Sequence, residues 1–331
     1  MPRMHCRNCG EEVSDQARFC LNCGHSTIDY RRDVPSRESI GFFKGTREAF
    51  LSLFRTSEAV GTPHKIAFDK PHASQYSVIQ KYGVAVLGLI IAVIVLDLIY
   101  GVGLQAISFV IPIVYLIWIR RTDRYEPEPK SLVLILFGWG MVSTVPSLFA
   151  NNAVFALASN EYVAATIGAP IIEETFKMLG LLWLVNSKKF RGQFNDHMDG
   201  LVYGFAVGMG FSVVEDAFYF YGVFATDGIS AVTGLFITRQ LLFGIGHGVF
   251  TAMTGRWLGL VRVRVGRVRT RDVLPGLTVA IFLHGLWNGT TIIPFMGIIL
   301  TIWFVIFVRR HIREALQDET SWGFSKDTTT N

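Results

Sequence analysis

The sequence predicts an all-α, polytopic membrane protein with about eight transmembrane helices and a small cysteine-rich module at its N-terminus. Of the 331 residues, 50% are hydrophobic and only 17% are charged, whereas a soluble domain usually has about 25% charged residues. Apolar runs long enough for helices that cross a bilayer recur after residue 82. The runs span residues 83–101, 103–119, 132–150, 161–185, 198–222, 231–260, 273–290 and 291–308.

The four cysteines all lie near the N-terminus, as Cys6-x2-Cys9 and Cys20-x2-Cys23, each pair in a glycine-containing turn. This spacing predicts a four-cysteine zinc ribbon over residues 1–25. So small a module cannot bury a core of its own, so zinc must supply its folding energy. Zinc thiolates need a reducing compartment, which places this end in the cytoplasm. Two disulfides are the alternative interpretation.

Residues 26–82 form a polar linker between the ribbon and the first apolar run. Within it, residues 39–55 carry phenylalanines near helical spacing with basic residues between them. This pattern predicts either an amphipathic helix at the membrane surface or a packed linker helix. No signal peptide is expected, because the first apolar run begins behind a polar N-terminus.

The connections between the apolar runs alternate in charge. Those near residue 102, at 151–160, at 223–230 and near 291 contain no Lys or Arg. Because basic connections remain in the cytoplasm, we expect a multi-pass cell-membrane protein with both termini inside. Its transmembrane domain spans 83–308 and its polar cytoplasmic tail 309–331. No nucleic-acid partner is expected, because the basic residues behind the net charge of +5 cluster in the short connections between apolar runs. The basic cytoplasmic connections hold Arg120, Arg121, Arg124 and Lys130; Lys188, Lys189 and Arg191; Arg262, Arg264, Arg267, Arg269 and Arg271; and Arg309, Arg310 and Arg313.

Ionisable residues occur inside four of the predicted helices. Each costs about 2.5–3.5 kcal/mol or more at the bilayer centre if it faces lipid, so such groups persist mainly where they face one another or water. We therefore expect one shared, hydrated site in the outer half of the membrane. Its residues are Glu173, Glu174 and Lys177 in IIEETFK, Glu215 in FSVVED, His247 in GIGHGVF, and His284 and Asn288 in LHGLWN.

Spacing within the helices supports a shared site. Glu173 and Lys177 are four residues apart, as are His284 and Asn288, so each pair shares a helix face. Structural alternatives exist for each pair: a neutralised ion pair in the first case and an interhelical hydrogen bond in the second. Asp97 and Arg239 are interpreted as structural or interfacial. Small-xxx-small pairs that let helices approach closely are Gly204 with Gly208 and Gly244 with Gly248.

A cluster of carboxylates and imidazoles beside water suits hydrolysis. A carboxylate can take a proton from water, and histidine or asparagine can donate to an oxyanion. Alternatively His247, His284 and a glutamate such as Glu173 bind a catalytic Zn²⁺. The sequence has no HExxH motif, no nucleophile elbow and no Walker A loop, so soluble zinc-protease, serine-hydrolase and ATPase interpretations lack support.

The motifs, taken together and in order, resemble those of the PrsW-type intramembrane proteases, which are related to the CPBP and CAAX prenyl protease group. The resemblance covers about residues 110–308 and excludes the zinc ribbon. The segments that carry it are DRYEPEP at 123–129, APIIEETFK, DGLVYGFAVGMGFSVVED, GIGHGVFTAMTG and LHGLWNG.

The resemblance implies catalytic roles for Glu173 and Glu174, with Glu215, His247 and His284 in the same site. Asn288 matches the last position of the HxxxN element, and Lys177 would hold the Glu173 face. CPBP relatives have His where this chain has Glu215. The family is described both as glutamic and as metal-dependent, and its implied substrate is a membrane-anchored anti-sigma factor.

The sequence therefore predicts an intramembrane endopeptidase that acts on a membrane protein within the lipid bilayer. The ribbon would bind structural Zn²⁺ and a cytoplasmic partner. Two alternatives are a proton- or cation-coupled transporter, since Glu and His also line proton paths, and a non-catalytic membrane scaffold.

Overall fold

The computed structural model describes residues 4–5, 12–13, 40–54, 73–100, 103–187, 189–290, 292–293 and 295–322. At the N-terminus, strands β1 (Met4–His5) and β2 (Glu12–Val13) pair antiparallel, with Met4 opposite Val13. The four cysteines of the predicted ribbon lie outside the described residues.

Most of the remaining described chain is helical, and each predicted apolar run overlaps a helical segment. The short helices outside the runs are α1 (Phe42–Leu51) and η3 (Arg191–Gln193). The segments that match the runs are α2 (Ala73–Tyr100); α3 (Leu104–Ser108) with α4 (Val110–Thr122); α5 (Lys130–Leu157); α6 (Glu161–Val163), η2 (Ala164–Gly168) and α7 (Ala169–Asn186); α8 (His197–Phe236); η4 (Ile237–Leu242) with α9 (Gly246–Val265); η5 (Thr270–Val273) with α10 (Leu274–Thr290); and α11 (Met296–Trp322).

The predicted turn at 223–230 is more helical than expected. Helical structure continues through it as part of α8, and only Gly228 departs from helical geometry, with φ 76° and ψ −173°. That conformation is readily adopted by glycine alone. The break at Gly228 therefore divides α8 at the place where the sequence predicts an outer turn.

By length and apolar composition alone, three described stretches are long and apolar enough to cross a membrane: Leu104–Thr122, Lys130–Leu157 and His197–Val265. Helix α7 is 18 residues long and includes Glu173, Glu174 and Lys177. These three ionisable residues make α7 less apolar than the three stretches above, so composition alone does not mark it as a membrane-spanning helix.

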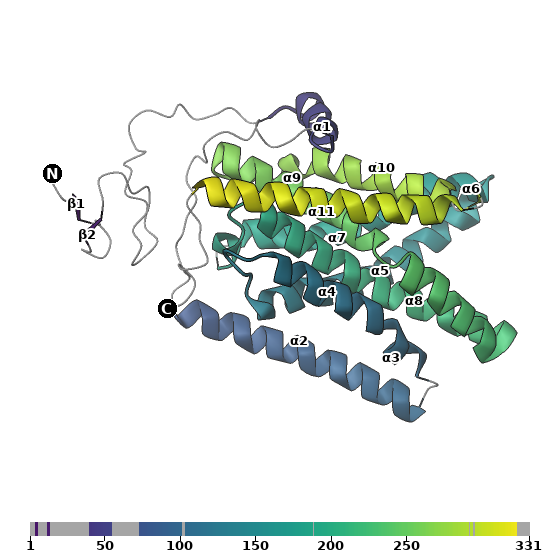
Figure 1. Ribbon diagram of the computed structural model, residues 1–331. Coiled ribbons are helices and arrows are strands. Elements are labelled where there is room, and N and C mark those ends of the chain that lie inside the picture. The colour runs from purple at the N-terminus through teal and green to yellow at the C-terminus, as the bar shows by residue number, and fades with distance from the viewer. Residues whose placement is uncertain are drawn as a thin grey trace.

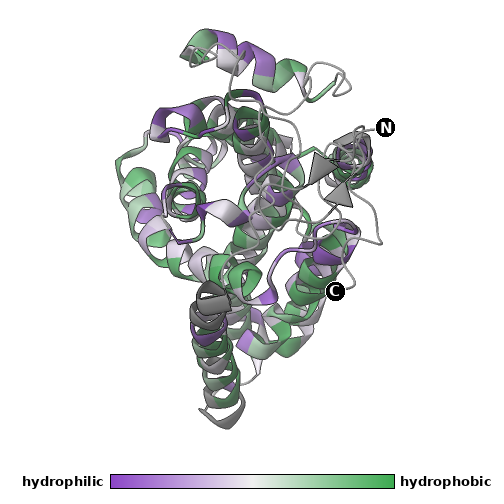
Figure 2. Cartoon of the chain, turned by 90° about the vertical axis from the view of Figure 1, so that its left-hand side faces the viewer, coloured by the Kyte–Doolittle hydropathy of each residue, from purple (hydrophilic) through white to green (hydrophobic). Residues whose placement is uncertain are grey.

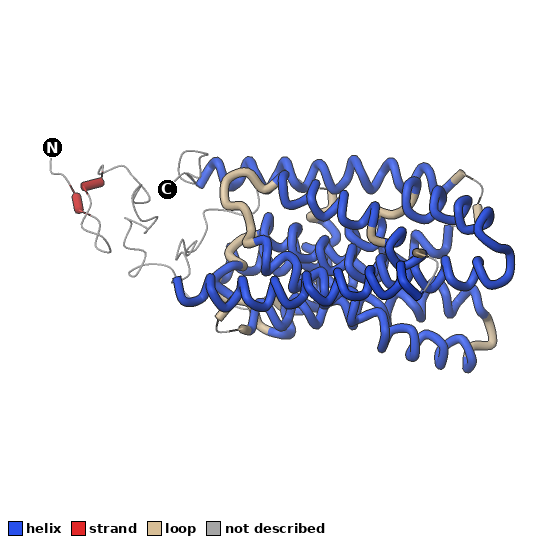
Figure 3. Tube along the Cα trace, turned by 90° about the horizontal axis from the view of Figure 1, so that it is seen from below, coloured by secondary structure: helices blue, strands red, loops and turns tan. Residues whose placement is uncertain are grey.

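The helices run side by side along one direction as a bundle (Figures 1 and 3). Seen along its axis, the bundle is largely hydrophobic (Figure 2). Helices α8 and α9 form its centre and pack backbone against backbone. A Cβ added to Gly208 would lie 2.1 Å from the His247 carbonyl oxygen, and one added to Gly204 would lie 2.6 Å from the Thr251 carbonyl oxygen. The predicted close approach through Gly204 and Gly208 is therefore present.

Helix α1 packs against α10 at one end of the bundle (Figure 1). Its Ala49 is buried, and the ring of Phe50 lies 5.4 Å from that of Phe282 on α10. Arg264 of α9 forms an ion pair of 2.9 Å with Glu48. Phe43, in the first turn of the helix, is 87% exposed. This helix is thus packed, as one of the two interpretations of the linker expects, and it also keeps an exposed aromatic face.

The DRYEPEP loop folds onto the start of α8 and creates a buried cluster of carboxyl groups. Asp196 caps α8 by accepting hydrogen bonds from the Met198 and Asp199 amides. The Tyr203 hydroxyl donates to Glu128 in the loop. The buried carboxyl groups of this cluster are those of Asp123, Glu128, Asp196, Asp199 and Glu319.

Glu319, near the end of α11, is a buried member of this cluster. It is 1% exposed, and neither carboxylate oxygen has a hydrogen-bond partner. Burial raises the pKa of Glu319 to about 11, and the negative charges of Asp196 and Asp123 contribute to the rise. In the unfolded chain this carboxyl titrates near about 4.3. Its contribution to stability is therefore full below about pH 4 and is lost as the pH rises towards the folded-state value.

We expect the melting temperature of the purified protein to fall as the pH rises from about 6 to about 9. Glu319→Gln, which stays neutral, should remove up to about 1 kcal/mol of this loss per pH unit. Differential scanning fluorimetry in detergent at graded pH measures the effect. The exposed Asp227 provides the control Asp227→Asn. Parallel pH curves for Glu319→Gln and the wild type would contradict the prediction.

Candidate active site

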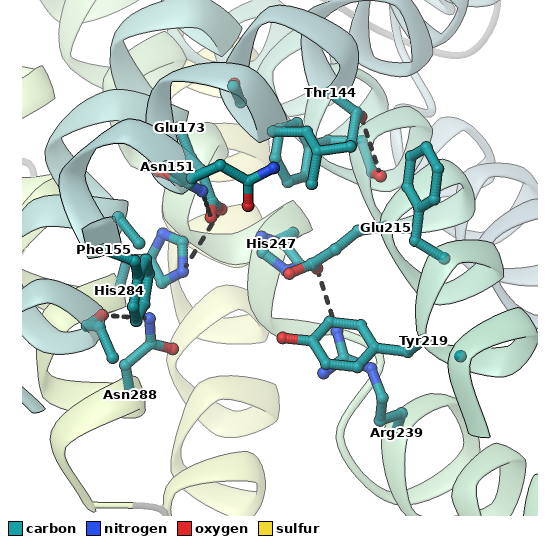
Figure 4. Close-up of a pocket in the computed structure, with 18 of the residues that line it drawn as sticks. Thr144, Asn151, Phe155, Glu173, Glu215, Tyr219, Arg239, His247, His284 and Asn288 are labelled. Atoms are coloured by element: carbon teal, nitrogen blue, oxygen red, sulfur yellow. Dashed lines mark hydrogen bonds and ion pairs between the residues drawn. The ribbon is translucent and has the colours of Figure 1, made fainter. Parts of the chain in front are cut away.

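Four of the predicted ionisable residues, each from a different helix, line one cavity (Figure 4). Glu174 and Lys177 are buried and do not belong to its lining. Glu173 and Lys177 lie on α7, Glu215 on α8, His247 on α9 and His284 on α10. His247 Nε2 lies 2.7 Å from Glu215 Oε2. The imidazole rings of His247 and His284 lie 5.1 Å apart and nearly perpendicular. Residues far apart in the sequence therefore share one space.

Lys177 occupies the centre of the polar cluster and is fully buried. Its Nζ lies 2.7 Å from Glu174 Oε1 and 3.7 Å from Glu173 Oε2. The same nitrogen lies 3.0 Å from His247 Nδ1 and 3.9 Å from the centre of the Phe211 ring. The predicted pairing of Lys177 with Glu173 exists, but Glu174 is the closer partner. One buried ammonium group thus holds a carboxylate and orients an imidazole.

The two neighbouring glutamates have different surroundings. Glu174 Oε1 is bonded to Lys177 and to His284 Nδ1, at 3.1 Å, and its Oε2 accepts from the Thr251 hydroxyl at 2.9 Å. Glu173 Oε1 accepts from Asn151 Nδ2 at 3.0 Å, whereas Oε2 is buried without a hydrogen-bond partner. Both oxygens of Glu174 are therefore occupied, and Glu173 keeps one oxygen for chemistry.

Glu173, His247 and His284 lie close enough together to hold a metal ion, for which His247 Nε2 would exchange its contact with Glu215 for the ion. Each offers one ligand atom within 4.8 Å of the others, and no other such group of His, Cys, Asp and Glu occurs in the described part of the chain. Two imidazoles and one carboxylate are a donor set of catalytic zinc sites, which leave a position open for water or substrate. The unpartnered Glu173 Oε2 is the atom that such a cation would satisfy.

Arg239, interpreted from the sequence as structural or interfacial, contributes directly to the site. It lies on the π-helix η4, 3.1 Å from Glu215 Oε2 and 2.8 Å from Asp216 Oδ1, and 3.8 Å over the Tyr219 ring. Arg239 and His247 contact the same oxygen of Glu215, so the arginine helps to neutralise this carboxylate. An arginine within an apolar run was the signal in the sequence that Arg239 belongs to a polar site. Its partners Glu215 and Asp216 lie on another helix, so spacing along the chain could not identify them.

Asn288 lines the cavity, and its Nδ2 donates to the Ala165 carbonyl of η2 at 2.9 Å. The hydrogen bond joins the end of α10 to the segment that leads into α7. Asp97 plays a structural part instead: it accepts from the Ala106 amide at 3.0 Å and from the Tyr221 hydroxyl. These contacts connect α2 with α3 and α8.

The sequence interpretation missed Asn151 and Thr251. Asn151 was expected in an outer turn at 151–160, but α5 continues as a helix to Leu157 and directs this side chain towards Glu173 (Figure 4). The segment NNAVFAL contains no glycine or proline, so a helix continuing through it could have been predicted from the sequence. Thr251 follows His247 by four residues, so it lies on the same face of α9.

The cavity has a volume of about 630 Å³, which is within the range of small-ligand and peptide sites. Its lining combines polar side chains with aromatic rings. Its lining includes Thr144, Asn151, Asn152, Phe155, Phe218, Tyr219, Trp287 and Asn288.

The helical bundle and its buried site of carboxylates and imidazoles define a multi-pass membrane hydrolase. The chain belongs to the PrsW family of intramembrane metalloproteases, whose family model matches residues 128–309. It is therefore a peptidase. A zinc-ribbon domain matches residues 5–27, which confirms the module predicted from the cysteines and implies bound zinc.

Relatives named Protease PrsW are similar to this chain over about half of its length. The Bacillus subtilis (strain 168) protein is 27% identical over 168 residues, which cover 50% of this chain and 72% of the relative. The Geobacillus kaustophilus protein is 26% identical over 168 residues, or 69% of its length. The Clostridioides difficile (strain 630) protein is 25% identical over 207 residues, covering 60% of this chain and 84% of the relative. No solved structure matches the chain significantly.

Proposed function

We propose that the chain hydrolyses a peptide bond of a membrane-anchored protein inside the cavity, with a zinc ion held by Glu173, His247 and His284. The observation that carries this proposal is the free Glu173 carboxylate oxygen beside two imidazoles. Zinc supplies Lewis acidity that polarises a carbonyl group and eases the deprotonation of water. Polarisation of the carbonyl group and easier deprotonation of water both favour hydrolysis of a peptide bond.

Glu215 is the residue placed to accept the proton of the attacking water. Its side chain is 20% exposed, and it lines the cavity beside His247. Glu174 is less suitable, because Thr251, Lys177 and His284 occupy both of its oxygens. The water oxygen attacks the carbonyl carbon, and Glu215 then passes the proton to the leaving amine as the C–N bond breaks.

Asn288 and Lys177 support the reaction in different ways. Asn288 lines the cavity, where an amide N–H can donate to the developing oxyanion. Lys177 is shut off from the solvent, so it acts by holding Glu174 and orienting His247 through Nδ1.

We infer a topology of eight crossings with both termini in the cytoplasm, supported by the alternation of basic connections. The cavity is lined by Asn151 and Phe155, close to the end of α5 at Leu157, and by Asn288, close to the end of α10 at Thr290. These helix ends lie opposite the basic connections. Cleavage should therefore occur towards the outer leaflet.

The substrate is inferred to be a transmembrane or juxtamembrane segment. The backbone of an extended peptide can bond to the polar side chains of the cavity, whereas a complete helix would have its backbone groups already satisfied. Family resemblance favours a membrane-anchored protein of the anti-sigma-factor kind. The ribbon would bind a cytoplasmic partner.

Removal of zinc tests the proposal. In proteoliposomes that hold the chain and a pool of single-span transmembrane peptides, 1,10-phenanthroline should lower product formation by about 100-fold or more, and added zinc should restore it. Mass spectrometry of the products measures this. The same loss in a variant with all four cysteines replaced by serine separates the membrane site from the ribbon. Ion or solute flux without peptide products would instead support a transporter.

A further inference from the structure

Glu173 is held in place by a residue from a different helix. Asn151 of α5 donates from Nδ2 to Glu173 Oε1 at 3.0 Å, and the two side chains lie next to each other in the cavity lining (Figure 4). Asn151 lines that cavity and is half-buried. The motifs of α7 to α10 do not include this residue.

The chemistry of the pair fixes how the Asn151 amide is turned. A carboxylate only accepts hydrogen bonds, so it must face the amide nitrogen and not the amide oxygen. Asn151 Oδ1 then points away from Glu173, and it is buried without a hydrogen-bond partner among the described residues. An unpaired amide oxygen is unfavourable, so this orientation shows how strongly the Glu173 carboxylate determines the arrangement.

Lys177 competes with the two imidazoles for the Glu173 carboxylate. Its Nζ lies 3.7 Å from Glu173 Oε2, at the same distance as His284 Nε2, but only 2.7 Å from Glu174 Oε1. A rotation of the Glu173 side chain towards Lys177 would give a shorter ion pair and remove Oε2 from the imidazoles. The hydrogen bond from Asn151 to Oε1 opposes that rotation.

We propose that Asn151 is a positioning residue that keeps Glu173 Oε2 directed at His247 and His284, so that the three residues can bind a metal ion together. This inference rests on the proposed function. Outer partners of metal ligands typically change metal affinity by about 10- to 100-fold. Asn151 therefore sets the zinc affinity of the site without touching the metal.

Zinc release from the purified full-length chain tests the proposal. Titration with a zinc chelator, followed by a chromogenic indicator, should show two steps: a tight one from the cysteines of the ribbon and a weaker one from the membrane site. Asn151→Asp keeps the size of the side chain but removes the donor, and Asn151→Ala removes the amide. Both should shift the weaker step by about 10- to 100-fold and leave the tight step unchanged. Asn151→Gln, which keeps an N–H donor, should recover part of the affinity.

Asn152 provides a matched control. It is the next residue on α5 and lines the same cavity, but it is exposed and makes no hydrogen bond to Glu173 in the described structure. Asn152→Ala should release zinc as the wild type does. Equal zinc affinity in Asn151→Asp and the wild type would overturn the inference, as would an equal loss in Asn152→Ala.

A Glu173→Ala variant separates the two hypotheses. If it loses the weaker zinc step and Asn151→Asp does not, the role of Asn151 is wrong and the metal site stands. If Glu173→Ala keeps both steps, the proposed metal site itself is wrong. Circular dichroism identifies any variant that fails to fold, and the ribbon step should be unchanged in every folded variant. If Asn151→Asp and Asn151→Ala do not fold, Asn151→Gln tests the inference. This variant keeps an N–H donor, so a full loss of zinc affinity in folded Asn151→Gln would contradict the role of the donor.

Discussion

Glu173→Gln is expected to reduce peptide-bond hydrolysis by at least about 1,000-fold while the protein remains folded. Glutamine matches glutamate in size, so the packing around the buried side chain is kept. It lacks the negative oxygen that now stands without a hydrogen-bond partner near His284. Removal of a buried charge that has only partial compensation should leave stability unchanged or slightly raised.

Product formation from single-span peptides in proteoliposomes, together with zinc content and melting temperature, measures this effect. Glu161→Gln is the control, because Glu161 is exposed in the first turn of α6. Its activity should match that of the wild type. Cleavage by Glu173→Gln within about tenfold of wild type would show that Glu173 is not essential, and hydrolysis would then have to depend on other carboxylates of the cluster.

Gly208→Ala is expected to have the largest effect on the assembly of the bundle. The added Cβ would lie 2.1 Å from the His247 carbonyl oxygen and 2.8 Å from Gly248 Cα, both of which belong to backbone that cannot give way easily. Helices α8 and α9 must therefore separate, which costs about 1–3 kcal/mol or more. The same movement displaces His247 from Glu215 and Lys177, so activity should fall by about 100-fold.

Thermal unfolding and cleavage by the purified variant measure both consequences. Gly234→Ala is the control: it lies in α8 beyond the break at Gly228, and nothing lies within 4 Å of a Cβ added there. Alanine favours helix over glycine by about 1 kcal/mol, so this control should be neutral or slightly stabilised. A Gly208→Ala protein as stable and active as Gly234→Ala would mean that the helices are less tightly packed than the structure shows.

The helices were predictable because hydrophobic runs are a local property. A run of apolar residues must leave water and satisfy its own backbone, and in lipid only a helix does so along one segment. The locations of Glu173 and His284 within such runs likewise indicated a site, because charged and polar groups are costly in lipid. Cysteine spacing indicated the ribbon for a similar reason: two CxxC pairs satisfy the ligand geometry of zinc locally.

The partners of those groups were less accessible. Spacing along α7 predicted a pair between Lys177 and Glu173, yet Lys177 lies closer to Glu174. The difference arises because helix spacing fixes the face of a side chain within about one turn, and His247 on another helix draws the ammonium group towards itself. Asn151 was missed since its importance depends on α5 lying opposite α7.

The sequence by itself determined that this is a multi-helical membrane protein with a zinc ribbon and a polar site contributed by four of its helices. Hydrophobicity, the cost of burying ionisable groups and the spacing of metal ligands are all local properties of the sequence. Only the tertiary structure decided which Glu173 oxygen is unpartnered, that Arg239 pairs with Glu215, and that Asn151 holds Glu173. Those relations depend on how rigid helices pack against one another through close glycine contacts. Differences of one ångström there select between a hydrogen bond and no contact.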